Sequence, residues 1–366
     1  MYFGLSEEQQ SFQEIIRKFL EDEATIDKIK LFNKGDLSDF PEAIHKGLLE
    51  LGINGLIIPE QYGGLGLDIL FATAVSQSLG AGVAPSPFIG SYVLAPYAIL
   101  QAGSDEQKEK YLSGISEAKI KFGVGLTEYI ASRDNAEIIF ENGKINGRAL
   151  FVIDAANATH YLISDSSGIL SIIDSNDPGL EIINLTTVDK TTSVVELKMN
   201  NVNAEQLDSP ENNSSNTQRL VDLGRLMIAA DSLGAAQVMI DKAVEYSMQR
   251  KQFGRAIGSF QAVKHMCAEM AAALEPCRSM VWYAAHTLDE LPEEAPMMVS
   301  HTKAHLSEVG QFITRTATEV HGGMGFTDLV GLHYWFKRVG FNRQIMGSPE
   351  WCRQRAFQLQ DLVSGH

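Results

Sequence analysis

Several features are scarce in this chain of 366 residues, and each scarcity excludes a class of protein. Only three cysteines occur, and Cys267, Cys277 and Cys352 are spaced too widely for a disulfide framework or a paired metal-ligand motif. Lysine and arginine number 30 against 46 acidic residues, and the net charge of −16 disfavours nonspecific binding to nucleic acid. No apolar run reaches the roughly 18 residues of a membrane helix, and the first residues form no cationic leader. We therefore expect reduced thiols, a cytoplasmic location, no nucleic-acid partner and no membrane span.

The apolar residues, 45% of the chain, follow helical spacing in the first third of the sequence. Ser6 and Gln9 have the spacing of a capping box, which predicts a helix that begins just after Ser6. The stretch PEQYGGLG at residues 59–66 interrupts the pattern and predicts a loop between helices. Another helix is expected to begin at Ser104 or Asp105, in the stretch GSDEQKEKYL. Residues 1–118 are therefore expected to form an all-helical domain.

The pattern changes near residue 119. Short β-branched segments separated by turn residues continue to about residue 205, which is typical of a β domain. The polar stretch 208–217 contains many breakers of regular structure and indicates a boundary. We therefore expect a β domain at residues 119–212.

Helical periodicity returns at Gln218 and lasts to the end of the chain. One apolar face predicts a long packed helix; it consists of Leu223, Leu226, Met227, Ala230, Leu233, Ile240 and Val244. Two more helices are expected over about 260–289 and 295–320, which predicts a helical bundle at residues 213–366. The expected fold class is α+β in three domains.

Two short motifs in the last domain suggest a binding site. The stretch RKQFG at residues 250–254 places cations, a phenylalanine and a glycine at the end of a helix, which is also an ordinary helix-ending signal. The stretch HGGMG at residues 321–325 contains Gly322 and Gly323, which lack a Cβ and would let a ligand approach the backbone closely. His321 fits a core or capping histidine equally well.

With the segments at residues 59–66 and 103–112, these motifs resemble the acyl-CoA dehydrogenase family of flavoproteins over essentially the whole chain. The resemblance implies an N-terminal helical domain, a β-barrel-like middle domain and a C-terminal four-helix bundle that drives oligomerisation. It also implies FAD between two subunits and the α,β-dehydrogenation of an acyl-CoA thioester to the 2-enoyl-CoA. Electrons would then pass to an electron-transfer flavoprotein.

The resemblance assigns a set of residues to the adenine and pyrophosphate end of FAD held by a neighbouring subunit. These are Arg250, Gln252, Phe253, Gln261, Glu319, Gly322 and Gly323. A guanidinium suits a diphosphate because its planar fork donates two parallel hydrogen bonds. Arg225 matches an arginine that shapes the substrate site, and an ion pair is the alternative role for it.

The middle domain departs from the family where the flavin ring would be held. The family turn runs threonine, glutamate, proline and then a glycine- and serine-rich loop closing on aspartate. The stretch LTEYIASRDN keeps Thr127, Glu128, Ser132 and Asp134 but carries Tyr129, Ile130 and Arg133 within the turn. A turn that binds through backbone amides is expected to be obstructed by such side chains. Phe151 and Ile153 stand where the family places a tryptophan and a threonine against the ring, and core packing is the alternative explanation.

The catalytic base is also missing. The two positions at which family members carry the glutamate match Met346 and Gly224, and neither residue can accept a proton at neutral pH, so no catalytic residue is assigned. The nearby carboxylates Glu350, Asp222 and Asp231 are more simply explained as helix charges or caps. Losing a general base typically costs about 10²- to 10⁴-fold in rate.

Three hypotheses follow. In the first, the chain is the base-lacking partner in a heterotetramer with a second acyl-CoA dehydrogenase-like chain, similar to bacterial members that oxidise CoA thioesters of steroid side chains, with two flavins per four chains. In the second, it is a homomeric enzyme with a relocated base such as Glu350. In the third, it is a flavin-free scaffold subunit.

Overall fold

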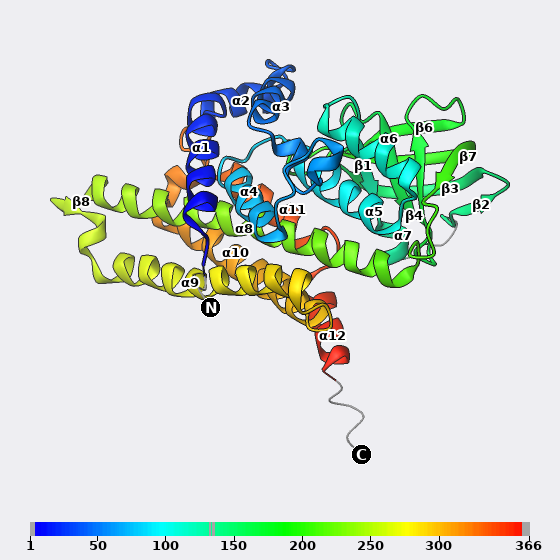
Figure 1. Cartoon of the computed structure of the whole chain (residues 1–366). Coiled ribbons are helices and arrows are strands. Elements are labelled where there is room, and N and C mark those ends of the chain that lie inside the picture. The colour runs from blue at the N-terminus through cyan, green and yellow to red at the C-terminus, as the bar shows by residue number, and fades with distance from the viewer. Residues whose placement is uncertain (1–3, 132, 134–135, 361–366) are drawn as a thin grey trace. The chain divides into compact units, whose positions relative to one another are not determined.

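The computed structural model describes residues 4–131, 133 and 136–360, and the chain divides into two compact units. The first unit consists of residues 1–44, 73–84 and 226–366, and the second of residues 45–72 and 85–225. Segments from both ends of the sequence therefore pack in the first unit. The fold is that expected from the sequence, with helices at both ends of the chain and a β-rich middle (Figure 1).

Two of the helices before the sheet, α1 (Glu7–Glu23) and α6 (Asp105–Ser116), begin at the capping residues that the sequence predicts. The others are α2 (Ile26–Lys34), α3 (Phe40–Glu50), α4 (Ile69–Ala81), η3 (Phe88–Leu94) and α5 (Ala95–Ala102), with short turns η1 (Ile53–Gly55) and η2 (Glu60–Tyr62). Ser6 and Gln9 form the predicted capping box at α1, and Ser104 forms one with Gln107 at α6. The side-chain oxygens satisfy amides that the first helical turn leaves unpaired. The predicted loop at 59–66 contains η2.

The long helices after the sheet match the predicted ranges closely. They are α8 (Ser214–Gln249), α9 (Gln261–Glu290), α10 (Ala295–His321), α11 (His333–Gln344) and α12 (Pro349–Leu359), with turns η4 (Ile257–Ser259) and η5 (Gly322–Phe326). The predicted apolar face of α8 is buried as far as Ile240, but Val244 is 41% exposed because the last turns of α8 lead into an exposed hairpin. By length and composition α8 could cross a membrane, yet its most apolar window is 89% buried inside the structure.

Helices α4 and α8 cross within the first unit at two glycines. A Cβ on Gly234 of α8 would lie 1.8 Å from the carbonyl oxygen of Gln77, and one on Gly80 of α4 would lie 2.0 Å from that of Asp231. Both obstacles are backbone atoms, so rotation of a side chain cannot relieve them. The two backbones can therefore approach this closely only with glycine at both positions.

The second unit contains one seven-stranded sheet in the order β2-β3-β1-β4-β5-β7-β6. The strands are β1 (Phe122–Gly125), β2 (Ile139–Glu141), β3 (Lys144–Ile153), β4 (His160–Ser164), β5 (Leu170–Asp174), β6 (Leu180–Asn184) and β7 (Val194–Gln206). Among the described strands of this sheet, β1 and β4 pair in parallel and the other pairs are antiparallel. Because β3 also pairs with β7, strands β3, β1, β4, β5 and β7 close on themselves, which confirms the barrel-like middle domain.

The barrel is filled by apolar side chains from its alternating inward positions. Its core includes Ile145, Ala149, Val152, Tyr161, Ile163, Ile173, Val195, Leu197, Met199 and Val202. The register of β3 against β7 shifts between Ala149 and Val152, and Phe151 in this bulge has a φ of 52°. A bulge re-aims the extra residue, and the Phe151 ring is 41% exposed whereas Ile153 is buried.

Three histidines link stability to pH. Burial lowers the pKa of His160, His321 and His333 below the ordinary value. When the pH falls below the ordinary histidine pKa of about 6.5, these histidines take up protons more readily in the unfolded chain than in the folded chain. We therefore expect the free energy of unfolding to fall as the pH drops below about 6.5. Carboxylates whose pKa is lowered in the folded chain, such as Asp174 and Glu205, also reduce the free energy of unfolding on acidification, but only at lower pH.

Urea denaturation at pH 7.5, 6.5 and 5.5 measures this loss. His160→Asn should flatten the dependence, whereas His265→Asn, which changes an exposed histidine, serves as the control. An unfolding midpoint that stays constant over this range would contradict the assignment.

Candidate functional site

The RKQFG motif forms a hairpin between α8 and α9 in the first unit. Strand β8 (Lys251–Gln252) pairs with β9 (Arg255–Ala256), and the hairpin lies at the shared end of α8 and α9 in Figure 1. Phe253 and Gly254 at its tip both have positive φ, 52° and 77°. This turn type suits the twist of paired strands, but a bulky residue rarely adopts its first position. The Phe253 side chain is nevertheless 91% exposed, so burial does not explain why a phenylalanine is there.

Arg250 joins this hairpin to the helix before it. Its amide donates to the Tyr246 carbonyl at 2.8 Å, and its own carbonyl accepts from the Ile257 amide at 2.8 Å. Arg250 and Gln252 are both exposed, and Gln261 is the exposed first residue of α9. The structure therefore brings these three predicted residues to one exposed end of the first unit.

The HGGMG motif ends α10. Gly322 has a φ of 58° and a ψ of −140°, a conformation that is essentially restricted to glycine, and its amide donates to the Glu319 carbonyl. A Cβ on Gly322 or on Gly323 would meet no atom within 4 Å. Both glycines and Glu319 are exposed. Open space beside an exposed glycine turn is what close approach of a ligand to the backbone requires.

A ring stack connects the two motifs. The Tyr246 ring on α8 lies against the His321 ring on α10, with centroids 4.4 Å apart and an angle of 23° between the rings. His321 Nδ1 donates to the Ala317 carbonyl at 2.8 Å, and the ring is buried. His321 is thus a core histidine, one of the two roles that its sequence allowed. The sequence interpretation missed Tyr246, although the four-residue spacing of Lys242, Tyr246 and Arg250 along one helix face was visible.

Arg225 is the last residue of the second unit. It is fully buried on α8, and its Nη1 donates to Asp222 Oδ1 at 2.8 Å. Gln218 also donates to that carboxylate, at 3.3 Å. The ion pair considered for Arg225 is therefore present, within the helix, and Asp222 is held by it. A role for Arg225 in binding substrate stays a prediction.

The position of the missing base keeps an unusual backbone. Met346 follows α11, is buried and has a φ of 58°, and Gly347 follows it with a φ of 114°. The substitute carboxylate Glu350, in the first turn of α12, has a side chain 63% exposed and pairs with Arg343 at 3.2 Å. Its own backbone amide, Ser348 and Arg343 lower its pKa, which makes it a weaker base.

Asp231 is similarly unavailable. Its Oδ1 accepts from Asn342 Nδ2 at 2.6 Å and lies 3.2 Å from Arg338 Nε in the interior of the first unit. Each of the three carboxylates considered as a replacement base is therefore paired with an arginine. Glu350 is thus an exposed helix charge as expected, whereas Asp222 and Asp231 are neither exposed charges nor caps but members of buried ion pairs.

The divergent turn of the middle domain is closed. Thr127–Ile130 form the short helix α7, whose following amides, on Ile130 and Ala131, donate to the carbonyls of Leu126 and Thr127. Glu128 is buried, and its Oε1 accepts from Arg133 Nη2 at 2.6 Å and Nε at 2.9 Å. Ser132 and Asp134 lie outside the described residues. Two amides of the turn and the Glu128 carboxylate thus have partners within the turn itself.

Tyr129 closes the turn from the other side. Its hydroxyl lies 3.0 Å from both the carbonyl oxygen and the Oγ of Ser214. The side chains predicted to obstruct a bound ring, Tyr129 and Arg133, are therefore fixed by their own partners. At the two positions where the family places a tryptophan and a threonine against the ring, Phe151 is exposed and aromatic. Ile153 is buried and has no polar side-chain atom to bind the ring.

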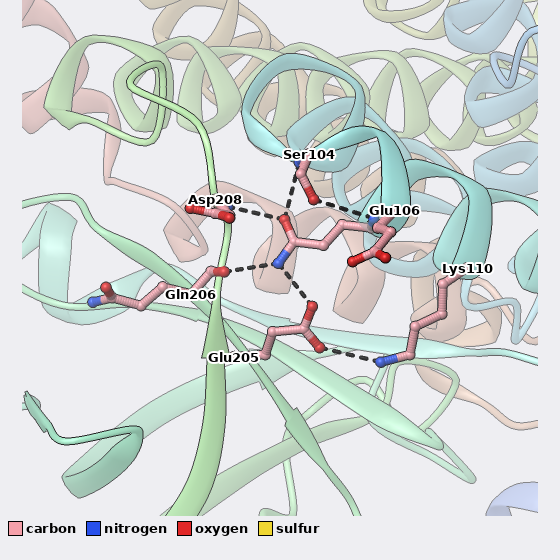
Figure 2. A pocket seen from close by; sticks show the side chains of 7 residues that line it. Ser104, Glu106, Lys110, Glu205, Gln206 and Asp208 are labelled. Atoms are coloured by element: carbon pink, nitrogen blue, oxygen red, sulfur yellow. Dashed lines mark hydrogen bonds and ion pairs between the residues drawn. The ribbon is translucent and has the colours of Figure 1, made fainter.

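A separate polar cleft of about 490 Å³ lies between α6 and the end of β7 (Figure 2). The Gln107 amide makes four hydrogen bonds there, donating to Glu205 Oε1 and the Gln206 carbonyl and accepting from the amides of Ser104 and Asp208. Three carboxylates, on Glu106, Glu205 and Asp208, outnumber the single lysine in the lining. An acidic lining of this kind repels the negatively charged coenzyme A, so we do not assign the substrate to this cleft. Its hydrogen bonds instead hold α6 against the end of β7.

Comparison with known proteins identifies the family. Residues 6–119 match the family model described as acyl-CoA dehydrogenase, N-terminal domain, and residues 215–356 match that of the C-terminal domain. The chain belongs to the acyl-CoA dehydrogenase family. It is 30% identical over 351 residues to caffeyl-CoA reductase-Etf complex subunit CarC of Acetobacterium woodii, covering 89% of this chain and 90% of that protein.

Solved structures show the same acyl-CoA dehydrogenase fold. A chain in a structure described as electron transferring flavoprotein of Acidaminococcus fermentans superposes with a TM-score of 0.86 at 25% identity, covering 98% of this chain and 99% of that one. A chain of the ChsE4-ChsE5 complex from Mycobacterium tuberculosis superposes with a TM-score of 0.87 at 22% identity, covering 99% and 100%.

Members of this family are FAD-dependent flavoproteins. The residues present fit one end of that cofactor and not the other. Gly322 and Gly323 leave open the space that a Cβ would fill, Arg250 and Gln252 are exposed, and these residues suit a nucleotide and its phosphates. In the middle-domain turn the Glu128 carboxylate is paired with Arg133 and the amides of Ile130 and Ala131 donate to nearby carbonyls, so these groups are not offered to the flavin ring.

Proposed function

We propose that this chain is the base-lacking subunit of a two-component acyl-CoA dehydrogenase and completes FAD sites that lie mainly on a second, related chain. The observation that carries the proposal is the contrast between its two halves of a cofactor site. Helix α7 is closed by its own contacts, whereas the hairpin and the glycine turn are exposed. A subunit that only completes the nucleotide end of a neighbour's FAD site needs an exposed hairpin and glycine turn, which we call the nucleotide-binding arm. It does not need an open turn at α7 for the flavin ring.

The residues of this chain would hold the nucleotide and take no part in proton transfer. Arg250 would donate paired hydrogen bonds to the pyrophosphate, and the backbone at Gly322 and Gly323 would pack against the nucleotide. Bound FAD supplies the acceptor for the hydride that leaves Cβ of the acyl-CoA as a proton leaves Cα. The partner chain would supply the glutamate, because Met346 cannot take a proton.

The further partners of this function are an acyl-CoA substrate and an electron-transfer flavoprotein, in the cytoplasm. The relative from Acetobacterium woodii is named as a subunit of a reductase-Etf complex, and the mycobacterial structure is described as a complex of two chains. Both support a multi-chain assembly for this chain. Steroid side-chain thioesters are the acyl class suggested by the resemblance.

The flavin-to-protein ratio tests the proposal. We expect the chain purified alone to be colourless, and the complex with a co-expressed acyl-CoA dehydrogenase-like chain from the same organism to contain one flavin per two chains. A yellow, active preparation of this chain alone would instead support a homomeric enzyme. Loss of that activity in Glu350→Gln would assign the base to Glu350.

A flavin-free scaffold is the other outcome. In that case the complex would hold flavin in an amount that is insensitive to changes in the hairpin. Absorbance at 450 nm against protein absorbance, measured for the chain alone, for the complex and for the complex with Arg250→Ala, separates the three outcomes. Only the homomeric enzyme is yellow alone, and only the proposed subunit loses flavin from the complex when Arg250 is replaced.

A further inference from the structure

The hairpin and the glycine turn are exposed segments from distant parts of the sequence, and a contact between half-buried Tyr246 and buried His321 joins the helices that support them. Tyr246 lies one turn before Arg250 on α8, and its carbonyl accepts from the Arg250 amide. His321 directly precedes Gly322 on α10. The stack, with ring centroids 4.4 Å apart, therefore joins Tyr246, whose carbonyl binds the Arg250 amide, to His321, which precedes the glycine turn.

The stack is held firmly on its α10 side. His321 Nδ1 donates to the Ala317 carbonyl one turn earlier, which fixes the orientation of the ring. Burial keeps the pKa of His321 low, so the ring is neutral at neutral pH and packs as an aromatic surface. On the α8 side, the ammonium of Lys242, one turn before Tyr246, lies 5.0 Å from the centre of the Trp335 ring of α11. The same face of α8 is thereby anchored by a second contact.

We propose that Tyr246 and His321 are positioning residues that set the spacing between the Arg250 guanidinium and the Gly322–Gly323 backbone. The inference rests on the proposed function, because it concerns the same nucleotide-binding arm. An extended nucleotide that touches both segments gains from each only when their separation matches its length. Preorganising the two segments before binding avoids the cost of ordering them afterwards.

A positioning role predicts that the effects of changing Tyr246 and Arg250 depend on each other, which a purely structural role of Tyr246 does not predict. If Tyr246 acts by positioning Arg250, then removing the Tyr246 ring should matter less once the guanidinium is gone. A double-mutant cycle measures this coupling directly. The quantity to measure is the dissociation constant of FAD from the two-chain complex, by flavin fluorescence after removal and titration of the cofactor.

We expect Tyr246→Ala to weaken FAD binding about 3- to 10-fold and Tyr246→Phe, which keeps the ring, to leave it within about 2-fold. In the Arg250→Ala background the same Tyr246→Ala change should cost less than about 2-fold. His321→Phe should retain more affinity than His321→Ala. Tyr283→Ala on α9 is the matched control, since it removes a tyrosine near a histidine in the same unit but far from both motifs.

Each outcome decides a different question. If Arg250→Ala leaves FAD binding unchanged, the proposed function fails. If Arg250→Ala weakens binding but the Tyr246→Ala cost is equal in both backgrounds, the positioning role is overturned and the proposed function stands. A Tyr246→Ala cost matched by Tyr283→Ala would likewise overturn it, because a general loosening of the helices would then explain the loss.

Discussion

Replacing Arg250 with alanine in the two-chain complex is expected to weaken FAD binding about 10- to 100-fold, because hydrogen bonds to charged groups contribute about 1.5–3 kcal/mol each. Arg250 is exposed at the end of α8, so its removal leaves no buried partner unsatisfied. The fold of the chain should therefore be unaffected. Flavin retained after gel filtration, together with a fluorescence titration, measures the effect.

Two variants make the Arg250 result interpretable. Arg250→Lys keeps the charge but loses the planar fork, so it should recover part of the affinity. Arg219→Ala removes an exposed arginine from the opposite end of the same helix and should have no effect. Equal losses in Arg250→Ala and Arg219→Ala would mean that total charge, and not a specific contact, governs flavin binding.

The Gly234→Ala variant is expected to lose about 3 kcal/mol or more of stability, and to yield little soluble protein. The added methyl would lie 1.8 Å from the Gln77 carbonyl oxygen, so helices α4 and α8 must separate. Separation would disturb contacts on both sides of the crossing, including the bond from Ser76 Oγ to the Met227 carbonyl. Circular dichroism during heating, with the soluble yield, measures the loss.

A second helical glycine provides the matched control. A Cβ on Gly340 of α11 would meet nothing within 4 Å, and the residue is exposed. Gly340→Ala should therefore stabilise the protein by about 0.5–1 kcal/mol, the usual difference between these residues in a helix. If both variants unfold at the wild-type temperature, the close crossing of α4 and α8 is wrong.

Local signals allowed much of the helical structure to be predicted. Capping boxes at Ser6 and Ser104 are contained within four residues, so the sequence carries the whole interaction. The ranges of α9 and α10 were expected from the helical periodicity of the sequence, at about 260–289 and 295–320. The π-helical segment η3 was not predicted, because Ser91 and Gly90 within it bind Phe122 and Asp154 far along the chain.

The candidate site was predictable in its parts but not in its assembly. Short motifs marked Arg250 and Gly322, since glycine and arginine have local chemistry that a single sequence displays. The Tyr246–His321 stack depends on how α8 and α10 pack, which no spacing within one helix encodes. The fate of Glu128 was hidden for the same reason, because its burial against Arg133 requires the folded turn.

The two losses in this chain differ in how readily they can be reversed during evolution. At Met346 the backbone still bends with a φ of 58°, so exchanging one side chain would place a carboxylate on an unaltered scaffold. At α7 the amides of Ile130 and Ala131 donate to nearby carbonyls and the Glu128 carboxylate is paired with Arg133, so several contacts would have to change together. Under the proposed function, a lineage that regained the carboxylate would still have to rebuild this turn before it could bind the flavin ring without a second chain.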